Sequence, residues 1–281
     1  SDRDGADGGH AINIGNQPIY TMYMPDAIAS YEFNSQTYYV IANEGDDRDD
    51  FIDETARVKD LDLDMNVFPN ADALQADDQL GRFTVSTLDG NTDADPQFEQ
   101  IIGYGGRSFS ILNSAGEMVF DSGSVMEQAI ANILPAFHNA NDGDPAEADT
   151  RSDNKGPEPE GVTVANIGGN MMAFVTLERA SGSIMAFNVT DPDDVQFSGL
   201  FTNPGDVSPE GVLVIPGADN STGKDLLVVS NETSNTLTIA AVETQMEATD
   251  APAFTLQILH GYAETGTLGI ETAPIFGALV D

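Results

Sequence analysis

The chain has 281 residues, with 10 Lys and Arg against 47 Asp and Glu, which gives a formal net charge of −37. A surface this acidic repels nucleic-acid phosphates and anionic membranes, and no stretch approaches the ~20 apolar residues of a membrane span. Cysteine is absent, so disulfides and thiol chemistry are excluded. At 40% hydrophobic residues the chain can still build a core. Its acidity suits either the salt-rich medium of a marine or halophilic microbe or a calcium-loaded protein whose charge is partly neutralised.

Short strand patterns dominate the sequence from one end to the other. They are β-branched, aromatic or alternating, and Gly, Asn, Asp or Pro bounds each one, as is typical of all-β domains. Two helices are expected, over residues 125–134, which Pro135 ends, and over residues 271–280. The predicted strands, in chain order, cover residues 37–43, 82–86, 107–112, 117–121, 172–177, 183–189, 225–230 and 236–240.

One layout, here called the Pro–acid layout, recurs three times. A proline and an acidic residue open it, a small and a β-branched residue follow, and a hairpin of two strands leads to a closing glutamate. It covers residues 25–44, 159–178 and 209–232. Such a unit is typical of the start of a propeller blade, a four-stranded antiparallel sheet whose innermost strand lines a central channel. A further blade without the layout is expected at residues 98–121.

The sequence therefore predicts an all-β fold, a partial β-propeller with four or so visible blades of about seven. Residues 1–245 would form the C-terminal part of a larger propeller, whose other blades would precede them on the same polypeptide. The polar opening run 1–10 has no signal-peptide pattern, so a processed start is expected. Long acidic insertions at residues 45–79 and 122–157 are either binding loops or merely solvated ones.

An acidic segment between two strands carries oxygen side chains at every second position. This spacing resembles the Asp-x-Asn-x-Asp pattern of calcium loops, in which alternate acids aim hard oxygen ligands inward. It departs from that pattern because Ala94 replaces the glycine expected at the sixth position, and because the final acid comes one residue early. A calcium loop and an acidic hairpin turn both remain open. The expected calcium ligands are Asp89, Asn91, Asp93, Asp95 and Glu99.

The acids of the Pro–acid layout recur at matching positions, so they are expected to converge near the channel mouth. Converging carboxylates repel one another unless a cation or an arginine lies between them. A metal or ligand site on the propeller axis is one interpretation. The other is that each acid caps the backbone N–H groups of its own blade. These channel acids are Asp26, Glu44, Glu160, Glu178, Glu210 and Glu232.

Groups for other chemistry are few. Arg107, in a Gly-Gly-Arg-Ser segment, and Arg151 are candidate anion-binding residues. The chain has three histidines, and it contains neither a Gly-x-Ser-x-Gly nucleophile motif nor a phosphate-binding loop. The sequence thus gives no confident catalytic residue.

Several segments together resemble the bacterial choice-of-anchor I family. The resemblance runs from about residue 12 to residue 239 and implies a secreted or surface propeller-like protein, of a kind often labelled alkaline phosphatase-like. The segments that carry it are Tyr-Met-Pro-Asp-Ala-Ile-Ala-Ser-Tyr at 23–31, Tyr-Val-Ile-Ala-Asn-Glu-Gly-Asp at 39–46, Glu-Thr-Ala-Arg-Val-Lys-Asp at 54–60, Gly-Gly-Arg-Ser-Phe-Ser at 105–110, Val-Phe-Asp-Ser-Gly at 119–123 and Arg-Ser-Asp-Asn-Lys-Gly-Pro-Glu-Pro-Glu-Gly at 151–161.

The tail resembles the start of a 5′-nucleotidase-type metallophosphatase, which is fused to this family in some marine bacteria. Residues 246–252 would be a linker, and residues 253–281 would hold the first strand and helix of that domain. The metallophosphatase pattern places Asp after Leu-His, whereas Gly261 follows His260 here, so His260 and Glu264 match it only weakly. A two-metal site would need the divalent metals and further ligands of a full-length protein.

Three functions follow as hypotheses. The first is an extracellular, periplasmic or cell-surface module that binds Ca²⁺ and serves as a binding or structural part of a larger secreted protein. The second is a share in a secreted phosphatase or nucleotidase-like hydrolase that scavenges phosphate. The third is esterase activity in the propeller channel. The expected partners are the remaining blades and the C-terminal domain of the same polypeptide, with a homo-oligomer or surface assembly left open.

Overall fold

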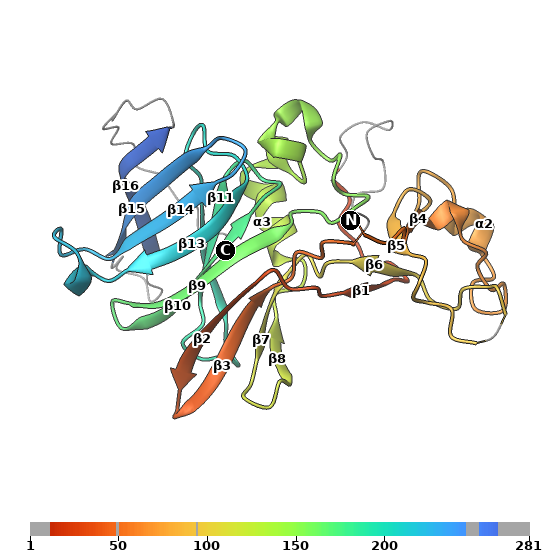
Figure 1. The fold of residues 1–281 in the computed structure, drawn as a ribbon, viewed down its shortest axis with the longest axis horizontal. Helices are drawn as coiled ribbons and strands as arrows, with labels where there is room; N and C mark the ends of the chain where they lie inside the picture. Colours follow the sequence, from red (N-terminus) through yellow and green to blue (C-terminus); the bar gives the residue numbers. More distant parts are fainter. Residues whose placement is uncertain (1–11, 49–50, 94, 246–252, 264–281) are drawn as a thin grey trace.

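A computed structural model describes residues 12–48, 51–93, 95–245 and 253–263 (Figure 1). Its strands form four sheets of four strands each, with few helices, which confirms the predicted all-β class. The first sheet joins β2 (Ala27–Phe33), β3 (Gln36–Ala42), β7 (Phe109–Leu112) and β8 (Met118–Asp121). The second joins β9 (Pro159–Ile167), β10 (Asn170–Leu177), β11 (Ser183–Asn188) and β12 (Gln196–Phe201). The third joins β13 (Pro209–Ile215), β14 (Leu226–Asn231), β15 (Thr236–Gln245) and β16 (Ala253–Ala263).

These three sheets are antiparallel and follow one another in chain order, and each opens with one copy of the Pro–acid layout. Their first strands lie side by side, because β9 contacts β2 on one side and β13 on the other. A hydrophobic cluster around Phe109 and Phe187 joins the first sheet to the second. A second cluster, around Phe174 and Leu227, joins the second sheet to the third. Alternate residues of each strand feed these clusters, since successive side chains point to opposite faces.

The fourth sheet, here called the side sheet, lies beside the first one. It joins β1 (Tyr20–Met22), β6 (Ile102–Tyr104), β5 (Thr84–Ser86) and β4 (Thr55–Arg57). The side sheet differs from the others because β1 pairs with β6 in parallel, and because it has its own core around Val58 and Phe83. Its insertion also holds the short helix α2 (Ala71–Leu74) and a 3₁₀ turn at Val58–Asp60.

The predicted separate blade at residues 98–121 is wrong. Its strands belong to two sheets: β6 completes the side sheet, while β7 and β8 complete the first sheet. Tyr39 of β3 pairs with Leu112 of β7 across the intervening insertion. The insertion splits one sheet into two hairpins far apart in sequence, and chain continuity therefore gave the wrong grouping.

The tail segment adds to the third sheet. β16 pairs with β15 in antiparallel fashion, from Thr236 opposite Ala263 to Gln245 opposite Ala253. The sequence predicts that this segment begins a metallophosphatase-like domain, and that domain stays a prediction. The expected linker at residues 246–252 and the expected helix at residues 271–280 lie outside the described residues.

The insertion at residues 122–157 folds back onto the second sheet. It contains α3 (Val125–Ile133), as predicted, and short 3₁₀ turns at Pro135–Phe137, Asn141–Gly143 and Pro145–Glu147. In the third sheet, the loop between β13 and β14 contains a 3₁₀ turn at Gly217–Asp219. Backbone bonds from Ala140 N to Arg179 O and from Arg179 N to Pro157 O attach the insertion to the end of β10. Within the described ranges, no helix is long and apolar enough to cross a membrane.

Candidate functional site

The hairpins of the three Pro–acid layouts bring their acids to one end of the sheets. In an antiparallel pair the start of the first strand lies opposite the end of the second. Pro159 pairs with Leu177, so Glu160 and Glu178 flank the same hairpin end. Pro209 pairs with Asn231 in the same way, which places Glu210 beside Glu232. In the first sheet Ala27 pairs with Ala42, next to Asp26 and Glu44.

A shared backbone kink precedes each of these hairpins. The residue before each opening proline has a left-handed φ, at 41° for Met24, 49° for Glu158 and 54° for Ser208. Residues with a Cβ rarely adopt this conformation, and a following proline disfavours it further. The carbonyls of Met24, Glu158 and Ser208 accept backbone bonds at 3.1, 2.9 and 2.7 Å from the closing acid or its neighbour. The kink therefore ties the opening and the closing of each layout together.

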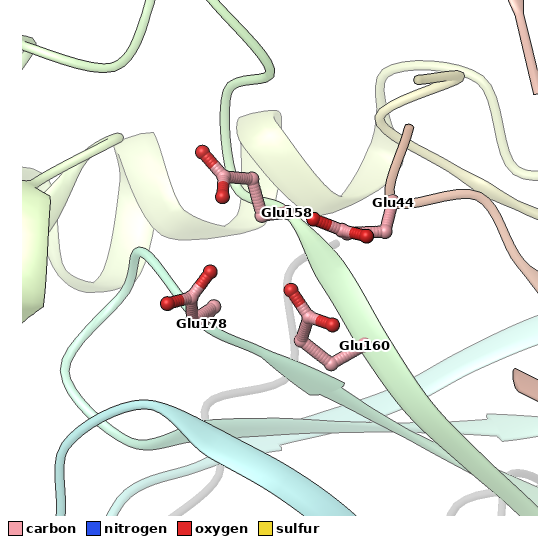
Figure 2. A group of neighbouring side chains, drawn as sticks. All are labelled: Glu44, Glu158, Glu160 and Glu178. Atoms are coloured by element: carbon pink, nitrogen blue, oxygen red, sulfur yellow. The ribbon is translucent and has the colours of Figure 1, made fainter. Parts of the chain in front are cut away.

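Because β2, β9 and β13 adjoin, the acids of the three layouts meet. Carboxylate oxygens of Glu44, Glu158, Glu160 and Glu178 all lie within 4.8 Å of one another. Figure 2 shows these four side chains gathered around one space at the start of β9. They are 0–9% exposed. Two overlapping groups within the same limit are Asp26, Glu160 and Glu210, and Glu178, Glu210 and Glu232. All seven residues are called the acid cluster below.

Three cations border one side of the acid cluster. The Nζ of Lys155 lies 2.7 Å from Oε1 of Glu44 and 3.6 Å from Oε2 of Glu158. Arg151 donates from Nε and Nη2 to Oε1 of Glu158 at 3.0 and 2.8 Å. Arg179 donates from Nε to Oε2 of Glu158 at 3.1 Å, and its Nη1 lies 2.9 Å from Glu178. Glu158 is thus the carboxylate that the protein itself neutralises.

The pKa values also separate Glu158 from Glu160 and Glu178. Burial raises the pKa of Glu158, but Arg151, Lys155 and Arg179 outweigh it and hold that pKa below 4.5. Burial, followed by repulsion from Glu44 and Glu210, raises the pKa of Glu160 to about 10. Burial also raises the pKa of Glu178 to about 8, although Arg179 partly offsets it. At neutral pH Glu160 and Glu178 therefore hold protons, which lower the charge repulsion within the acid cluster.

Negative charge in the acid cluster exceeds what its neighbours neutralise. Among the described residues, no Lys or Arg lies within ion-pair distance of Asp26, Glu160, Glu210 or Glu232. No described backbone N–H donates to the side chains of the six channel acids either, so the capping interpretation has no hydrogen bond to support it. Carboxylate oxygens are hard ligands that suit Ca²⁺. A cation in this space would replace the protons of Glu160 and Glu178.

The chain matches the choice-of-anchor I domain over residues 1–192. It belongs to the choice-of-anchor I family. Two curated relatives are similar to parts of this choice-of-anchor I chain. Gigasin-3a of Magallana gigas is 31% identical over 188 residues, covering 59% of this chain and 66% of that protein. The mesenchyme-specific cell surface glycoprotein of Strongylocentrotus purpuratus is 30% identical over 127 residues, covering 40% of this chain and 16% of the glycoprotein.

The match therefore spans less than two thirds of either relative's length. No solved structure matches the chain significantly. The family match covers the first and second Pro–acid layouts by residue number, and the third layout lies beyond residue 192.

The predicted calcium loop brings together a subset of its expected ligands. Oxygens of Asp93, Asp95 and Glu99 lie within 4.8 Å of one another. Asp93 and Asp95 also accept backbone bonds within the turn, at 2.8 Å each, and Glu99 accepts from Thr92 N at 2.6 Å. Asp89 instead accepts from Ser86 Oγ at 2.9 Å. Asn91 donates to the carbonyl of Asp95 at 2.6 Å. Ala94 lies outside the described residues, and calcium binding here stays a prediction.

The two candidate anion-binding arginines are engaged by the protein. Arg107 donates to Glu127 at 2.9 Å and to the carbonyls of Ser152 and Asn154 at 2.6 and 2.7 Å. Arg107 itself has a left-handed φ of 55°, which turns it toward α3. Arg151 is bound to Glu158 as described above. An anion would have to compete with these acceptors, so anion binding by Arg107 and Arg151 stays a prediction.

The remaining sequence-based candidates are the weak phosphatase matches. The backbone of His260 is part of β16, and Glu264 lies outside the described residues. Sequence reasoning also missed two members of the site, Lys155 and Glu158. Their signal was present, because Lys155 is one of only three lysines and stands in the Lys-Gly-Pro-Glu-Pro-Glu run that opens the second layout.

Proposed function

We propose that this choice-of-anchor I chain is a calcium-binding module of a secreted or cell-surface protein, in which it serves a binding or structural role. The single observation that carries the proposal is the convergence of carboxylates from three repeated hairpins in one largely buried space. Calcium takes six to eight oxygen ligands, and Mg²⁺ retains more of its water. An acid cluster of seven carboxylates with three neighbouring cations fits the larger, more flexible ion.

The location is proposed from the relatives. One of them is named as a cell surface glycoprotein, and the family match covers residues 1–192. Extracellular fluids contain enough calcium to fill sites of modest affinity, in the 10⁻⁴–10⁻³ M range of extracellular modules. The high negative charge of the chain is screened in salt-rich media.

We also propose that the three layout-bearing sheets are successive blades of a β-propeller. Each has four antiparallel strands, and their first strands adjoin as the inner strands of blades do. On this architecture the acid cluster lies at one mouth of the central channel. The phosphatase hypothesis remains a prediction, because His260 is placed only by its backbone and Glu264 lies outside the described residues. The esterase hypothesis, which depends on calcium and the channel glutamates, also remains a prediction.

Thermal unfolding of the chain after chelation, with and without added calcium, tests the proposal. Saturation at 100 times the dissociation constant should add about 2.7 kcal/mol to the free energy of unfolding by mass action. Glu160→Gln should abolish most of this gain, because it removes a central carboxylate while keeping the side-chain shape. The exposed Glu117, which accepts from Asn113, gives the matched control Glu117→Gln. No shift of the melting temperature at millimolar calcium would refute the site.

A further inference from the structure

The face of the third sheet that points away from the second sheet is apolar. Val212, Leu227, Val229 and Ala240 pack toward the second sheet, so the alternate residues point outward. Leu213 and Leu237 on this outer face are 49% and 38% exposed, whereas Leu226 and Ala241 on the same face are 8% and 0% exposed. The exposed part of the face is therefore the part around Leu213 and Leu237. Paired positions build two continuous rows and one shorter pair: Leu213–Val228–Ile239, Ile215–Leu226–Ala241 and Ser230–Leu237.

The second sheet has the same rows on the face that the third sheet covers. When the layouts are aligned on their closing glutamates, position 174 corresponds to position 228. The equivalent rows are Thr163–Phe174–Ala186, Ala165–Met172–Asn188 and Thr176–Ile184. Phe174, Met172 and Ala186 are fully buried, because the third sheet packs on them. The outer face of the third sheet therefore repeats, position for position, a surface that elsewhere in this chain receives another sheet.

Gly161 of β9 and Gly211 of β13 occupy equivalent positions, and neither has a side chain that would keep another strand away from its backbone. A Cβ on Gly161 would lie 2.2 Å from the carbonyl oxygen of Glu210, so the absence of a side chain lets β13 approach β9. Gly211 is the counterpart in β13. Among the described residues, the one atom within 4 Å of a Cβ on Gly211 would be Oγ of Ser230. Within the described part of the chain, the space that β13 fills beside Gly161 is thus open beside Gly211.

The hydroxyl groups of Thr176 and Ser230 occupy equivalent positions and make equivalent hydrogen bonds. Thr176 Oγ1 accepts from Gly161 N at 2.8 Å and lies 3.3 Å from the carbonyl oxygen of Glu210 on the neighbouring sheet. Ser230 Oγ accepts from Gly211 N at 3.1 Å and donates to the carbonyl oxygen of Gly211 at 3.4 Å, and Ser230 is exposed. The third sheet therefore offers the aliphatic rows, the glycine and the hydroxyl that the second sheet uses to hold its neighbour.

The first sheet carries a surface equivalent to the one by which the third sheet packs onto the second sheet. Val212 of the third layout packs onto the second sheet, and its equivalent in the first layout is Ile28, which is 67% exposed. On the same face of the first sheet, Met118 is 45% exposed. Ile41 and Ser110, which lie on this face beside Ile28, are 8% and 0% exposed. The first sheet therefore exposes the part of this docking surface around Ile28 and Met118.

We propose that the outer face of the third sheet docks the first sheet of a second copy of this chain. In this head-to-tail contact, β2 of the second copy lies against β13 as β13 lies against β9, and Ile28 covers the Leu213 row. Such a contact is heterologous, so two copies close into a ring if the geometry allows, and otherwise longer assemblies form. The contact depends on the repeated sheets and not on calcium.

Sedimentation velocity or light scattering on the full chain over a wide concentration range tests the proposal. The expected result is a mass above the 29.8 kDa of one chain that grows with concentration. Leu213→Lys and Gly211→Val should each weaken self-association at least about tenfold, as for loss of a central interface contact. Met65→Lys changes a side chain that is 53% exposed elsewhere and should leave association unchanged. Far-ultraviolet circular dichroism checks that every variant is folded.

Mixing two variants separates the head-to-tail contact from other dimers. Ile28→Lys should also block self-association, because it spoils the other half of the contact. An equimolar mixture of Ile28→Lys with Leu213→Lys should form a one-to-one heterodimer, since each variant keeps the half that the other lacks. A chain that is monomeric at all concentrations would overturn the proposal and would assign the face to a different partner. Self-association of Ile28→Lys alone would also overturn it, because the dimer would then join two identical faces.

Discussion

The ammonium group of Lys155 lies 2.7 Å from Oε1 of Glu44, across a sequence separation of 111 residues. This ion pair joins the insertion before the second sheet to the end of β3 in the first sheet. Both residues are buried, at 6% and 8% exposure. Lys155 thus holds together two of the hairpin ends that form the acid cluster.

Removing this ammonium should destabilise the fold strongly. Lys155→Met keeps the length of the side chain but leaves the buried Glu44 without its cation, while Arg151 and Arg179 still bind Glu158. A broken buried pair costs about 3 kcal/mol. The matched control is Lys59→Met, because Lys59 pairs with Asp77 at 2.9 Å on the surface. A surface pair contributes less than about 1 kcal/mol. Urea unfolding at neutral pH measures the loss in free energy of unfolding for both variants. Equal losses in Lys155→Met and Lys59→Met would contradict the structural role of Lys155.

The stability of the calcium-free chain should fall as pH rises. The pKa of Glu160 is about 10 in the folded chain against 4.5 for an ordinary glutamate, and that of Glu178 is about 8. The folded state therefore binds more protons than the unfolded state between these values, and the free energy of unfolding decreases with pH there. The contribution is fully present below pH 4.5 and is lost as pH rises through the folded pKa values.

Urea unfolding at several pH values between about 6 and 9, in chelator, measures this slope. Glu160→Gln should flatten the slope, because its amide does not titrate. Saturating calcium should flatten it as well, because the ion favours the charged carboxylates. A slope that is unchanged in Glu160→Gln would show that other groups cause the decrease.

The two equivalent glycines should respond differently to the same substitution. Gly161→Ala places a methyl group against the Glu210 carbonyl, which cannot move without shifting β13, so the melting temperature should fall. Gly211→Ala meets only the rotatable hydroxyl of Ser230 and should leave the melting temperature of the monomer close to that of the parent chain. Thermal unfolding at low protein concentration compares them, and equal losses would contradict the inter-sheet role of Gly161.

The acidic loop should contribute a second and separable calcium response. Asp93→Asn with Asp95→Asn removes two charges from the group that also contains Glu99. If the loop binds calcium, this double variant should lose one class of sites and keep the acid cluster. The ratio of bound calcium to protein, measured by equilibrium dialysis, should then fall by about one per chain. An unchanged ratio would identify the loop as an acidic turn.

The repeated sequence layout predicted more of this molecule than the strand patterns did. Positions such as Asp26, Glu160 and Glu210 recur at fixed places in hairpins, and antiparallel pairing alone then brings each one beside its closing glutamate. The grouping of strands was less predictable. β3 and β7 pair across a long insertion, and nothing local in the sequence encodes that pairing.

The cationic half of the site was hidden for a similar reason. Lys155 and Arg179 lie far apart along the chain from Glu44, and only the folding of the 122–157 insertion onto β10 brings them together. The pairing of Arg107 with Glu127 likewise depends on where α3 packs. Tertiary packing therefore decides which arginines face acids inside the protein and which face solvent.

Calorimetric titration of calcium into the chelator-treated chain at pH 7, in two buffers of different ionisation enthalpy, is the most direct test of the acid cluster. The account predicts binding with release of about one to two protons per ion, because Glu160 and Glu178 are protonated before the ion enters. Glu160→Gln should bind more weakly and release fewer protons. Heat that is the same in both buffers, or no binding at millimolar calcium, would contradict the account.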